Sequence, residues 1–493
     1  MNTRFPRLIL TALAGLVALL LSAHAAPPPN ILILLVDDLG QRDIGAYNPG
    51  TFYETPNIDR LAAEGVLFRD GYAANPVCSP SRYSVMTGKH PTRAMLTNWL
   101  PGQRTERFRD APIVENMELS EVTIAEMLRG AGYRTALVGK WHLGEDETHW
   151  PEHQGFDINI GGWSKGRPDS YFSPYKNPRL KDGPKGEYLP VRLANETSTL
   201  LRQFHAEKSP FLLVHSFYEV HGPFQAPDDL VEKYRRKAER LGLENKFGEE
   251  AQYHYQNDQK RRVREVQNHA VYAAMMESLD RAVGTILGTL KELGLDQNTF
   301  VVFVSDNGGL STAEGTPTSN LPWRGGKGWV YEGGIRVPFI VKSPTTMSRG
   351  GVVNSTPVIT TDLAPTLLAL TGTKTPAGVH FDGVNFLPLL SSSRRANKER
   401  PLFWHYPHYS NQGGFPGGAV REGKWKLIEN YEDGSVALYD LEKDPGEKND
   451  LAASQPDRVN TLRTKLHAWY VEAGAKFLRP GKAGQQPWAP SAE

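Results

Sequence analysis

The residues of this 493-residue chain that are best suited to chemistry include its single cysteine, Cys78. A lone cysteine cannot form an intramolecular disulfide, so it is either a small buried hydrophobe or a group with a reactive role. Cys78 follows a loop rich in small residues, and Ser81 to Met86 can begin a helix. Because free N–H groups and the dipole at a helix N-terminus favour negative charge, this placement indicates a reactive position.

Two polar pairs directly follow apolar runs that are typical of buried strands. Asp37 and Asp38 follow one run, and Asp306 and Asn307 follow another. Ligand sites in open α/β sheets lie at the carboxyl ends of strands, so the two pairs can converge. Three carboxylates in one pocket would repel by roughly 4 kcal/mol per pair at about 4 Å and an effective dielectric near 20, and a bound cation removes that cost. Oxygen ligands alone favour a hard ion, Ca²⁺ before Mg²⁺. Taken singly, each pair is more typical of a turn or a helix cap.

Four basic residues have the chemistry to bind an anionic ester and to move a proton. Lys140 and His142 alternate, so their side chains face the same way if the segment is extended. His221 precedes Gly-Pro after an apolar run, and Lys327 lies in a loop whose glycines allow backbone to approach a ligand closely. The alternative for each residue is an ordinary loop position, solvated or hydrogen-bonded locally.

Two longer motifs resemble signatures of a known family. The run from Cys78 to Gly88, CSPSRYSVMTG, resembles the activation motif of the type I sulfatases in the alkaline phosphatase superfamily. The run from Gly132 to Gly144, GYRTALVGKWHLG, resembles the second signature of that family, and the similarity extends from Asn30 to about Ala453. In the family the cysteine is oxidised during export to formylglycine, and the hydrated aldehyde is the nucleophile. The resemblance implies that a formylglycine-generating or equivalent maturation enzyme converts Cys78 to 3-oxoalanine.

The resemblance also implies a metal site. The family binds a divalent cation beside the formylglycine and one sulfate oxygen. The positions that match its ligands are Asp37, Asp38, Asp306 and Asn307, together with the modified Cys78. One Ca²⁺ per chain is therefore expected, with Mg²⁺ as the less favoured ion.

The same comparison implies a role for each basic residue. Arg82 would stabilise the hydrated aldehyde, while Lys140 and Lys327 would hold the sulfate oxygens. The alcohol would leave with a proton from His221 or Lys327. His142 would then deprotonate the remaining hydroxyl, which expels sulfate. Covalent catalysis of this kind splits one difficult hydrolysis into two easier steps.

The elements that must position these residues alternate between strand and helix. Continuous apolar runs predict buried strands over Asn30–Val36, Arg134–Gly139, Phe211–Ser216 and Thr299–Ser305. Helical spacing predicts helices over Asn57–Gly65, Thr123–Gly130 and Glu265–Leu293. The expected fold class is α/β, a large mostly parallel sheet sandwiched by helices.

A second, smaller unit is expected because the chain is longer than one core usually supports. We place the catalytic α/β domain at residues 26–390 and an α+β domain at 391–493, with Ser391–Arg400 as a polar connector. In the second domain, predicted strands over Gly418–Glu429 and Val436–Leu441 flank an Asp433-Gly434 turn. A helix over Asp457–Ala473 completes the expected antiparallel sheet with a packed helix.

The amino-terminal residues 1–25 are typical of a secretory signal peptide. Arg4 and Arg7 precede an apolar stretch, Leu8–Leu21, and an Ala-His-Ala cleavage site follows. The stretch is shorter than the ~20 residues of a spanning helix, so we expect an exported protein, periplasmic or secreted, without a membrane anchor. A net charge of +1 gives no reason to expect nucleic acid as a partner, and the sequence specifies no oligomeric state.

Substrate recognition is expected from aromatic and polar clusters. Trp163 and Tyr171, with His405 and His408 of the second domain, suit a sugar ring and its hydroxyls, although packing between domains explains them equally well. The resemblance is closest to exo-acting sulfatases for galactose or N-acetylgalactosamine sulfates, and implies a sulfated polysaccharide or glycosaminoglycan as substrate. The alternatives are a phosphate or phosphonate ester hydrolase of the same superfamily and a noncatalytic glycan-binding protein.

Overall fold

The computed structural model describes residues 27–250, 260–344, 350–391, 400–481 and 484–490. Its main element is an eight-stranded sheet in the order β11-β2-β10-β9-β1-β6-β4-β5. The parallel centre consists of β9 (Thr299–Ser305), β1 (Asn30–Val36), β6 (Phe211–Ser216) and β4 (Arg134–Gly139). All four strands have the bounds predicted from the sequence, because a strand that is buried on both faces carries an uninterrupted apolar run.

The remaining strands are short and make the sheet mixed. Antiparallel β10 pairs with both β9 and β2, whereas β11 and β5 pair in parallel with their neighbours. These strands are β2 (Val66–Phe68), β5 (Ile158–Ile160), β10 (Phe339–Lys342) and β11 (Val352–Asn354). Two further pairs lie outside the sheet, β3 (Gly71–Tyr72) with β12 (Val358–Ile359) and β7 (Phe247–Glu250) with β8 (Arg261–Arg264).

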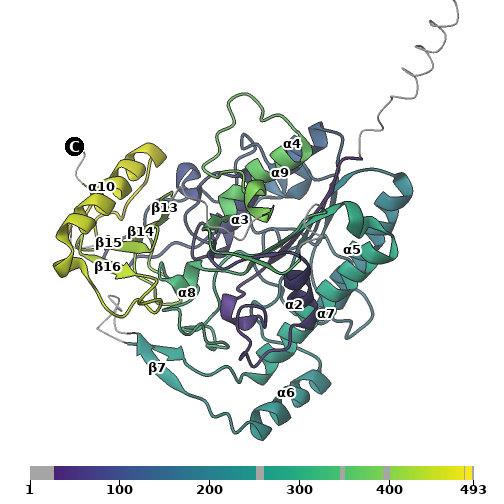
Figure 1. Ribbon diagram of the computed structural model, residues 1–493, viewed down its shortest axis with the longest axis horizontal. Coiled ribbons are helices and arrows are strands. Elements are labelled where there is room, and N and C mark those ends of the chain that lie inside the picture. The colour runs from purple at the N-terminus through teal and green to yellow at the C-terminus, as the bar shows by residue number, and fades with distance from the viewer. Residues whose placement is uncertain (1–26, 251–259, 345–349, 392–399, 482–483, 491–493) are drawn as a thin grey trace, which may run out of the picture.

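Helices cover both faces of the sheet (Figure 1). One face packs on α2 (Pro56–Glu64), α5 (Leu189–Glu207), α6 (Asp228–Arg240) and α7 (Ala270–Glu292). The other face packs on α3 (Cys78–Thr87), α4 (Ile124–Gly130) and α9 (Leu363–Thr371). Along β1 the side chains alternate between the two cores, Leu32 and Leu34 in the first and Ile31 and Ile33 in the second. The predicted α/β sandwich is therefore confirmed.

One predicted helix begins later than its apolar spacing indicates. The sequence predicts a helix over Glu265–Leu293, but α7 starts at Ala270. His269 ends the preceding segment, and its ring accepts a hydrogen bond from the backbone N–H of Tyr272. This side-chain cap satisfies one of the free N–H groups of the first turn and sets the start of the helix.

The carboxyl-terminal part is an antiparallel sheet with one packed helix. It contains β13 (Leu402–Tyr406), β14 (Gly417–Glu422), β15 (Trp425–Asn430), β16 (Val436–Asp440) and α10 (Pro456–Ala473). The prediction of a single strand over Gly418–Glu429 is wrong, because Gly423 has a φ of +58° in a turn that divides the segment into β14 and β15. The predicted Asp433-Gly434 turn does join β15 to β16, and Gly434 has a φ of +75°.

The small sheet packs against the loop and the short helix that follow Lys327 in the chain. One face contacts α10, and the other contributes Trp404 and Ile428 to a core shared with Trp329 and Tyr331. Helix α8 (Glu332–Ile335) lies at this junction. Residues 1–25 and most of the connector 391–400 lie outside the described residues, so the signal peptide and the domain boundary stay predictions. Within the described residues, no helix has the length and apolar character needed to cross a bilayer.

Candidate active site

The residues predicted for catalysis and metal binding come together at the carboxyl ends of the parallel strands. Asp37–Asp38 directly follow β1, Asp306–Asn307 directly follow β9, and Lys140 directly follows β4. The strand register aligns these ends, since the N–H of Asp306 donates to the carbonyl of Val36 at 3.0 Å. Neighbouring parallel strands end at the same edge of the sheet, so polar residues far apart in the chain share one site.

Buried ion pairs hold two of the carboxylates. Lys140 Nζ lies 2.7 Å from Asp37 Oδ2, and Lys327 Nζ lies 2.8 Å from Asp38 Oδ1. The side chains of these four residues are at most 3% exposed. Burial alone would raise the pKa of Asp38, but the charge of Lys327 lowers it below its usual range, and His221 adds to this effect when its ring is protonated. The pairing therefore keeps this carboxylate ionised away from water.

Arg82 crosses the same edge of the sheet from the second turn of α3. Its Nε donates to Asp306 Oδ2 at 2.8 Å, and its Nη1 donates to Ser216 Oγ at 2.6 Å and to the carbonyl of Lys140 at 3.2 Å. Ser216, the last residue of β6, also donates its hydroxyl to the Lys140 carbonyl at 2.6 Å. Ser216 is not among the residues predicted from the sequence. The signal that identifies it is a polar residue at the end of an apolar strand, next to the other strand ends.

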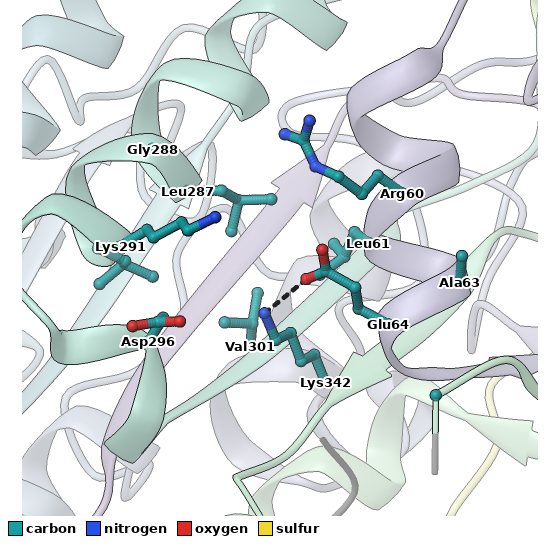
Figure 2. A pocket seen from close by; sticks show the side chains of 12 residues that line it. Arg60, Leu61, Ala63, Glu64, Leu287, Gly288, Lys291, Asp296, Val301 and Lys342 are labelled. Carbon is teal, nitrogen blue, oxygen red and sulfur yellow. Dashed lines mark hydrogen bonds and ion pairs between the residues drawn. The ribbon is translucent and has the colours of Figure 1, made fainter. Parts of the chain in front are cut away.

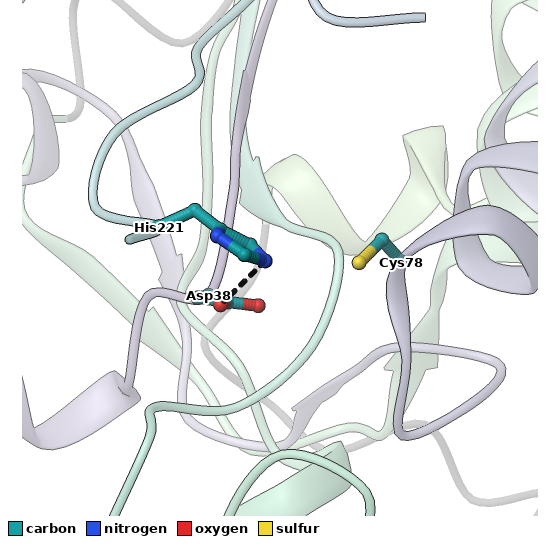
Figure 3. A group of neighbouring side chains, drawn as sticks. All are labelled: Asp38, Cys78 and His221. Atoms are coloured by element: carbon teal, nitrogen blue, oxygen red, sulfur yellow. Dashed lines mark ion pairs between the residues drawn. The ribbon is translucent and has the colours of Figure 1, made fainter. Parts of the chain in front are cut away.

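Cys78 is the first residue of α3, as the loop-to-helix pattern predicts. Its Sγ lies within 4.8 Å of carboxylate oxygens of both Asp37 and Asp306, and a second group at the same spacing joins it with Asp38 and His221. Figure 3 shows the Cys78 thiol and the His221 ring pointing toward one another, with Asp38 beside the ring. The His221 Nε2 is 3.6 Å from Asp38 Oδ2.

Burial has the largest effect on the pKa of the Cys78 thiol and on that of the His221 ring. It raises the pKa of the Cys78 thiol to about 11, although Lys140 and Lys327 oppose the shift. Desolvation therefore outweighs the favourable helix N-terminus that the sequence indicates. Burial likewise lowers the pKa of His221 to about 4, and the positive charge of Lys327 acts in the same direction. In the absence of a bound anion, the ring of His221 is neutral near pH 7.

His142 adopts a conformation that the alternation with Lys140 does not predict. Its φ is +59°, so the segment after β4 is not extended at this residue. The ring is buried, and its Nε2 lies 2.9 Å from the carbonyl oxygen of Leu100. A carbonyl can only accept, so Nε2 carries the proton, and Nδ1 is a buried acceptor without a hydrogen-bond partner among the described residues. Burial, with Lys140 and Arg82, lowers the pKa of His142 well below its usual value.

The donor set fits a hard divalent cation. Asp37 Oδ1 and Asn307 Oδ1 are buried, and neither has a hydrogen-bond partner in the described part of the chain. Burial raises the pKa of Asp37 well above its ordinary value, with Lys140 opposing the shift, and a bound cation would favour the ionised form. Carboxylate and amide oxygens are the ligands of Ca²⁺ and Mg²⁺. The site thus has the ligand chemistry of a metal centre.

A family model described as Sulfatase matches residues 29–373, which contain every group of this site. The chain belongs to the sulfatase family. A second model, N-sulphoglucosamine sulphohydrolase C-terminal, matches residues 324–473. The resemblance of the two sequence motifs is therefore confirmed, and the chain is a sulfuric ester hydrolase of the alkaline phosphatase superfamily.

Curated relatives and solved structures extend over nearly the whole sulfatase. N-acetylgalactosamine-6-sulfatase of Sus scrofa is 34% identical over 541 residues, which cover 99% of this chain and 94% of the relative. Steryl-sulfatase of Homo sapiens is 30% identical over 538 residues, covering 90% and 88%. A crystal structure of Ps i-CgsB in complex with k-i-k-neocarrahexaose has a TM-score of 0.73 and 28% identity, and covers 90% of this chain and 92% of that chain.

The four residues predicted to bind sugar divide into two groups. Tyr171, His405 and His408 are fully buried, and each makes hydrogen bonds within the protein, which favours the packing alternative for them. Trp163 is half-buried, and its carbonyl accepts a hydrogen bond from the N–H of His142 at 3.2 Å. Tyr171 also touches the backbone of a site residue, since its hydroxyl donates to the carbonyl of His221 at 2.9 Å. Of the two residues that adjoin the site of the sulfatase, only Trp163 is partly exposed.

A separate cavity of about 570 Å³ lies between α2 and α7 (Figure 2). Its walls carry charged side chains, and Lys342 lies 2.7 Å from Glu64 there. Val301, the third residue of β9, lines this cavity, whereas Asp306 follows the last residue of the same strand. The cavity therefore lies toward the other end of the strand and contains none of the active-site residues.

Proposed function

We propose that this sulfatase is an exported enzyme that hydrolyses sulfate esters of a carbohydrate, through formylglycine made from Cys78 and with a bound Ca²⁺. The observation that carries the proposal is the placement of Cys78 Sγ within 4.8 Å of the carboxylate oxygens of Asp37 and Asp306, at a site with the buried ammonium groups of Lys140 and Lys327. The site thus combines a modifiable side chain, cation ligands and groups that attract an anion.

The charges of the site support the need for a metal ion. Three carboxylates, those of Asp37, Asp38 and Asp306, are paired with the cations of Arg82, Lys140 and Lys327. The paired groups have no net positive charge with which to bind a sulfate ester. When bound, a Ca²⁺ ion supplies this charge and polarises the sulfate oxygens. The alternative ion, Mg²⁺, demands a stricter octahedral geometry.

The remaining steps use side chains of the chain itself. Lys140 and Lys327 orient the sulfate oxygens, and His221 or Lys327 protonates the leaving alcohol. His221 Nδ1 lies 2.9 Å from the carbonyl of Gly222, so Nδ1 carries a proton, and Nε2 becomes a donor only when the ring is protonated, which a bound sulfate anion favours. His142 has the opposite arrangement, since its Nδ1 is the free acceptor. His142 is thus arranged to remove a proton from the hydrated residue 78.

The carbohydrate part of the proposal rests on the relatives. The Sus scrofa protein is an N-acetylgalactosamine-6-sulfatase, and Ps i-CgsB was crystallised with a neocarrahexaose. We infer a galactose or N-acetylgalactosamine sulfate within a polysaccharide or glycosaminoglycan as the substrate. Export through the signal peptide at residues 1–25 belongs to the same proposal, because conversion of Cys78 by a maturation enzyme accompanies export in the family.

The decisive test compares one sequence in two states. The chain is produced with and without a formylglycine-generating enzyme, and the peptide that contains Cys78 is weighed by mass spectrometry, since conversion makes it lighter. We expect sulfate release only from the converted form, and none from Cys78→Ala. Sulfated galactose and N-acetylgalactosamine standards, with products located by NMR, identify the ester. Full activity of material with an intact thiol would refute the nucleophile, and a preference for matched phosphate esters would refute the proposed sulfate-ester substrate.

A further inference from the structure

An exposed carboxylate, Glu314, lies beside the active site on the loop that follows β9. This loop begins with the Asp306–Asn307 pair, and the N–H of Lys327 donates to the carbonyl of its residue Gly309 at 3.1 Å. A Cβ at the adjoining Gly315 would contact the ring of Phe224 at 3.5 Å, three residues beyond His221 in the chain. Glu314 therefore stands between the segment that carries Lys327 and the segment that carries His221.

The carboxylate of Glu314 is oriented by two amide side chains. Gln412 Nε2 donates to its Oε1 at 2.5 Å, and Asn411 Nδ2 donates to the same oxygen at 3.3 Å. No hydrogen bond to Oε2 is found among the described residues. Glu314 also has a φ of +52°, a left-handed conformation that is uncommon for a residue with a side chain. The second carboxylate oxygen is thus available to a ligand.

The charge of Glu314 reaches the catalytic groups. Gln412, which holds the Glu314 carboxylate, extends to the residue next to Lys327, since a Cβ at Gly328 would lie 2.9 Å from Gln412 Oε1. The negative charge of Glu314 favours the protonated form of Lys327, and it opposes the larger effect of burial on the pKa of His221. Because a sulfate ester is an anion, an exposed carboxylate beside the site repels the sulfate group and favours hydrogen-bond donors instead. In a substrate of this enzyme, such donors are on the alcohol part. A carboxylate accepts strong hydrogen bonds from hydroxyl groups, and its two oxygens can accept from two of them.

We propose that Glu314 is a specificity-determining residue that accepts hydrogen bonds from hydroxyls of the sugar next to the scissile ester. The same charge disfavours sugars that carry a second sulfate or a carboxylate at that place. Asn411 and Gln412 are positioning residues that hold the carboxylate. The inference rests on the proposed carbohydrate function. It narrows the substrate to a sulfate ester of a sugar that carries no second charged group next to the scissile ester.

The test measures how substrate preference changes in two variants of the converted enzyme. Glu314→Gln removes the charge but keeps an oxygen that can accept the hydrogen bond from Gln412. Glu239→Gln, on the exposed surface of α6, is the matched control because it makes the same change of charge. The substrates are 4-nitrophenyl sulfate, galactose and N-acetylgalactosamine sulfated at O4 or O6, and N-acetylgalactosamine 4,6-disulfate. Values of kcat and KM are measured for each ester, and thermal melting checks the fold.

We expect Glu314→Gln to lower the ratio of kcat/KM for the best monosulfated sugar over 4-nitrophenyl sulfate by about 10–100-fold, the loss of a hydrogen bond to a charged acceptor. Its preference for the monosulfated over the disulfated sugar should fall by about tenfold, whereas Glu239→Gln changes neither ratio by more than about twofold. Unchanged ratios in Glu314→Gln, while the wild type desulfates sugars, would overturn this inference alone. A wild type that cleaves only the aryl ester would overturn the carbohydrate proposal together with it.

Discussion

Replacing Lys426 should destabilise the junction between the two sheets far more than replacing a lysine on its surface. Lys426, on β15, is fully buried, with its Nζ 3.0 Å from Glu332 Oε1 and 2.8 Å from Glu447 Oε1. Both carboxylates are also fully buried. Arg336 gives Glu332 a second ion pair at 3.3 Å, but no other ion pair of Glu447 is found among the described residues. Lys426→Met keeps the apolar stem and leaves the carboxylates without their shared cation.

The expected cost follows from this geometry. Breaking a buried pair by removing one partner costs about 3–5 kcal/mol, because the remaining charge stays buried. With an unfolding entropy of about 2.1 cal/mol/K per residue, a chain of this length loses roughly 1 °C per kcal/mol, so the melting temperature should fall by about 3–5 °C. Lys424→Met is the control, since Lys424 is 34% exposed and pairs with Asp440 at 2.7 Å, an interaction worth at most about 1 kcal/mol.

The cost should also depend on pH. Burial raises the pKa of Glu447 to about 7, from an ordinary value of 4.5, even while Lys426 opposes the shift. Without Lys426 the folded-state pKa rises further, so the folded variant keeps a proton that the unfolded chain releases. This contribution to stability is present below pH 4.5 and is lost as the pH rises through the folded pKa. The difference between Lys426→Met and wild type, measured by urea denaturation, is thus larger at pH 8 than at pH 5. Equal losses for both lysine variants, or a loss independent of pH, would refute the reasoning.

Two further predictions concern the metal ion and the histidines. Removal of divalent ions with EDTA and desalting should abolish sulfate release. Ca²⁺ should restore it better than Mg²⁺, because Ca²⁺ accepts carboxylate and amide oxygens in a flexible geometry whereas Mg²⁺ demands a near-ideal octahedron. Full activity after chelation would contradict the metal site. Burial lowers the pKa of His90 to about 4 and that of His405 to about 3, so between pH 6.5 and 4 the unfolded chain binds protons that the folded chain does not. The free energy of unfolding should therefore fall as the pH drops through this window, by up to roughly 3 kcal/mol for His90. When this free energy is measured by urea denaturation at several pH values, it should depend less on pH in His90→Gln than in the wild type.

The sequence predicts the centre of the fold well because its signals are local. Each central strand is one uninterrupted apolar run, and Asp37 and Asp306 directly follow such runs, so pairing of the strands is sufficient to bring them together. The sequence is less informative about turns and about which polar residues are buried. Gly423 divides a segment that looks continuous, since only its positive φ marks the turn. His405 and His408 are buried by the packing of the second sheet, which their residue types do not reveal.

The second sheet is a structural part of the active site. The N–H of Gly328, next to Lys327, donates to the carbonyl of Pro76 at 2.8 Å, two residues before Cys78. This bond sets the position of the lysine relative to the modified residue. On the other side, any Cβ at Gly328 would collide with Ser410, which follows β13. Because Lys327 and Cys78 are held between the two sheets, loosening the carboxyl-terminal sheet should disturb catalysis before it unfolds the large sheet.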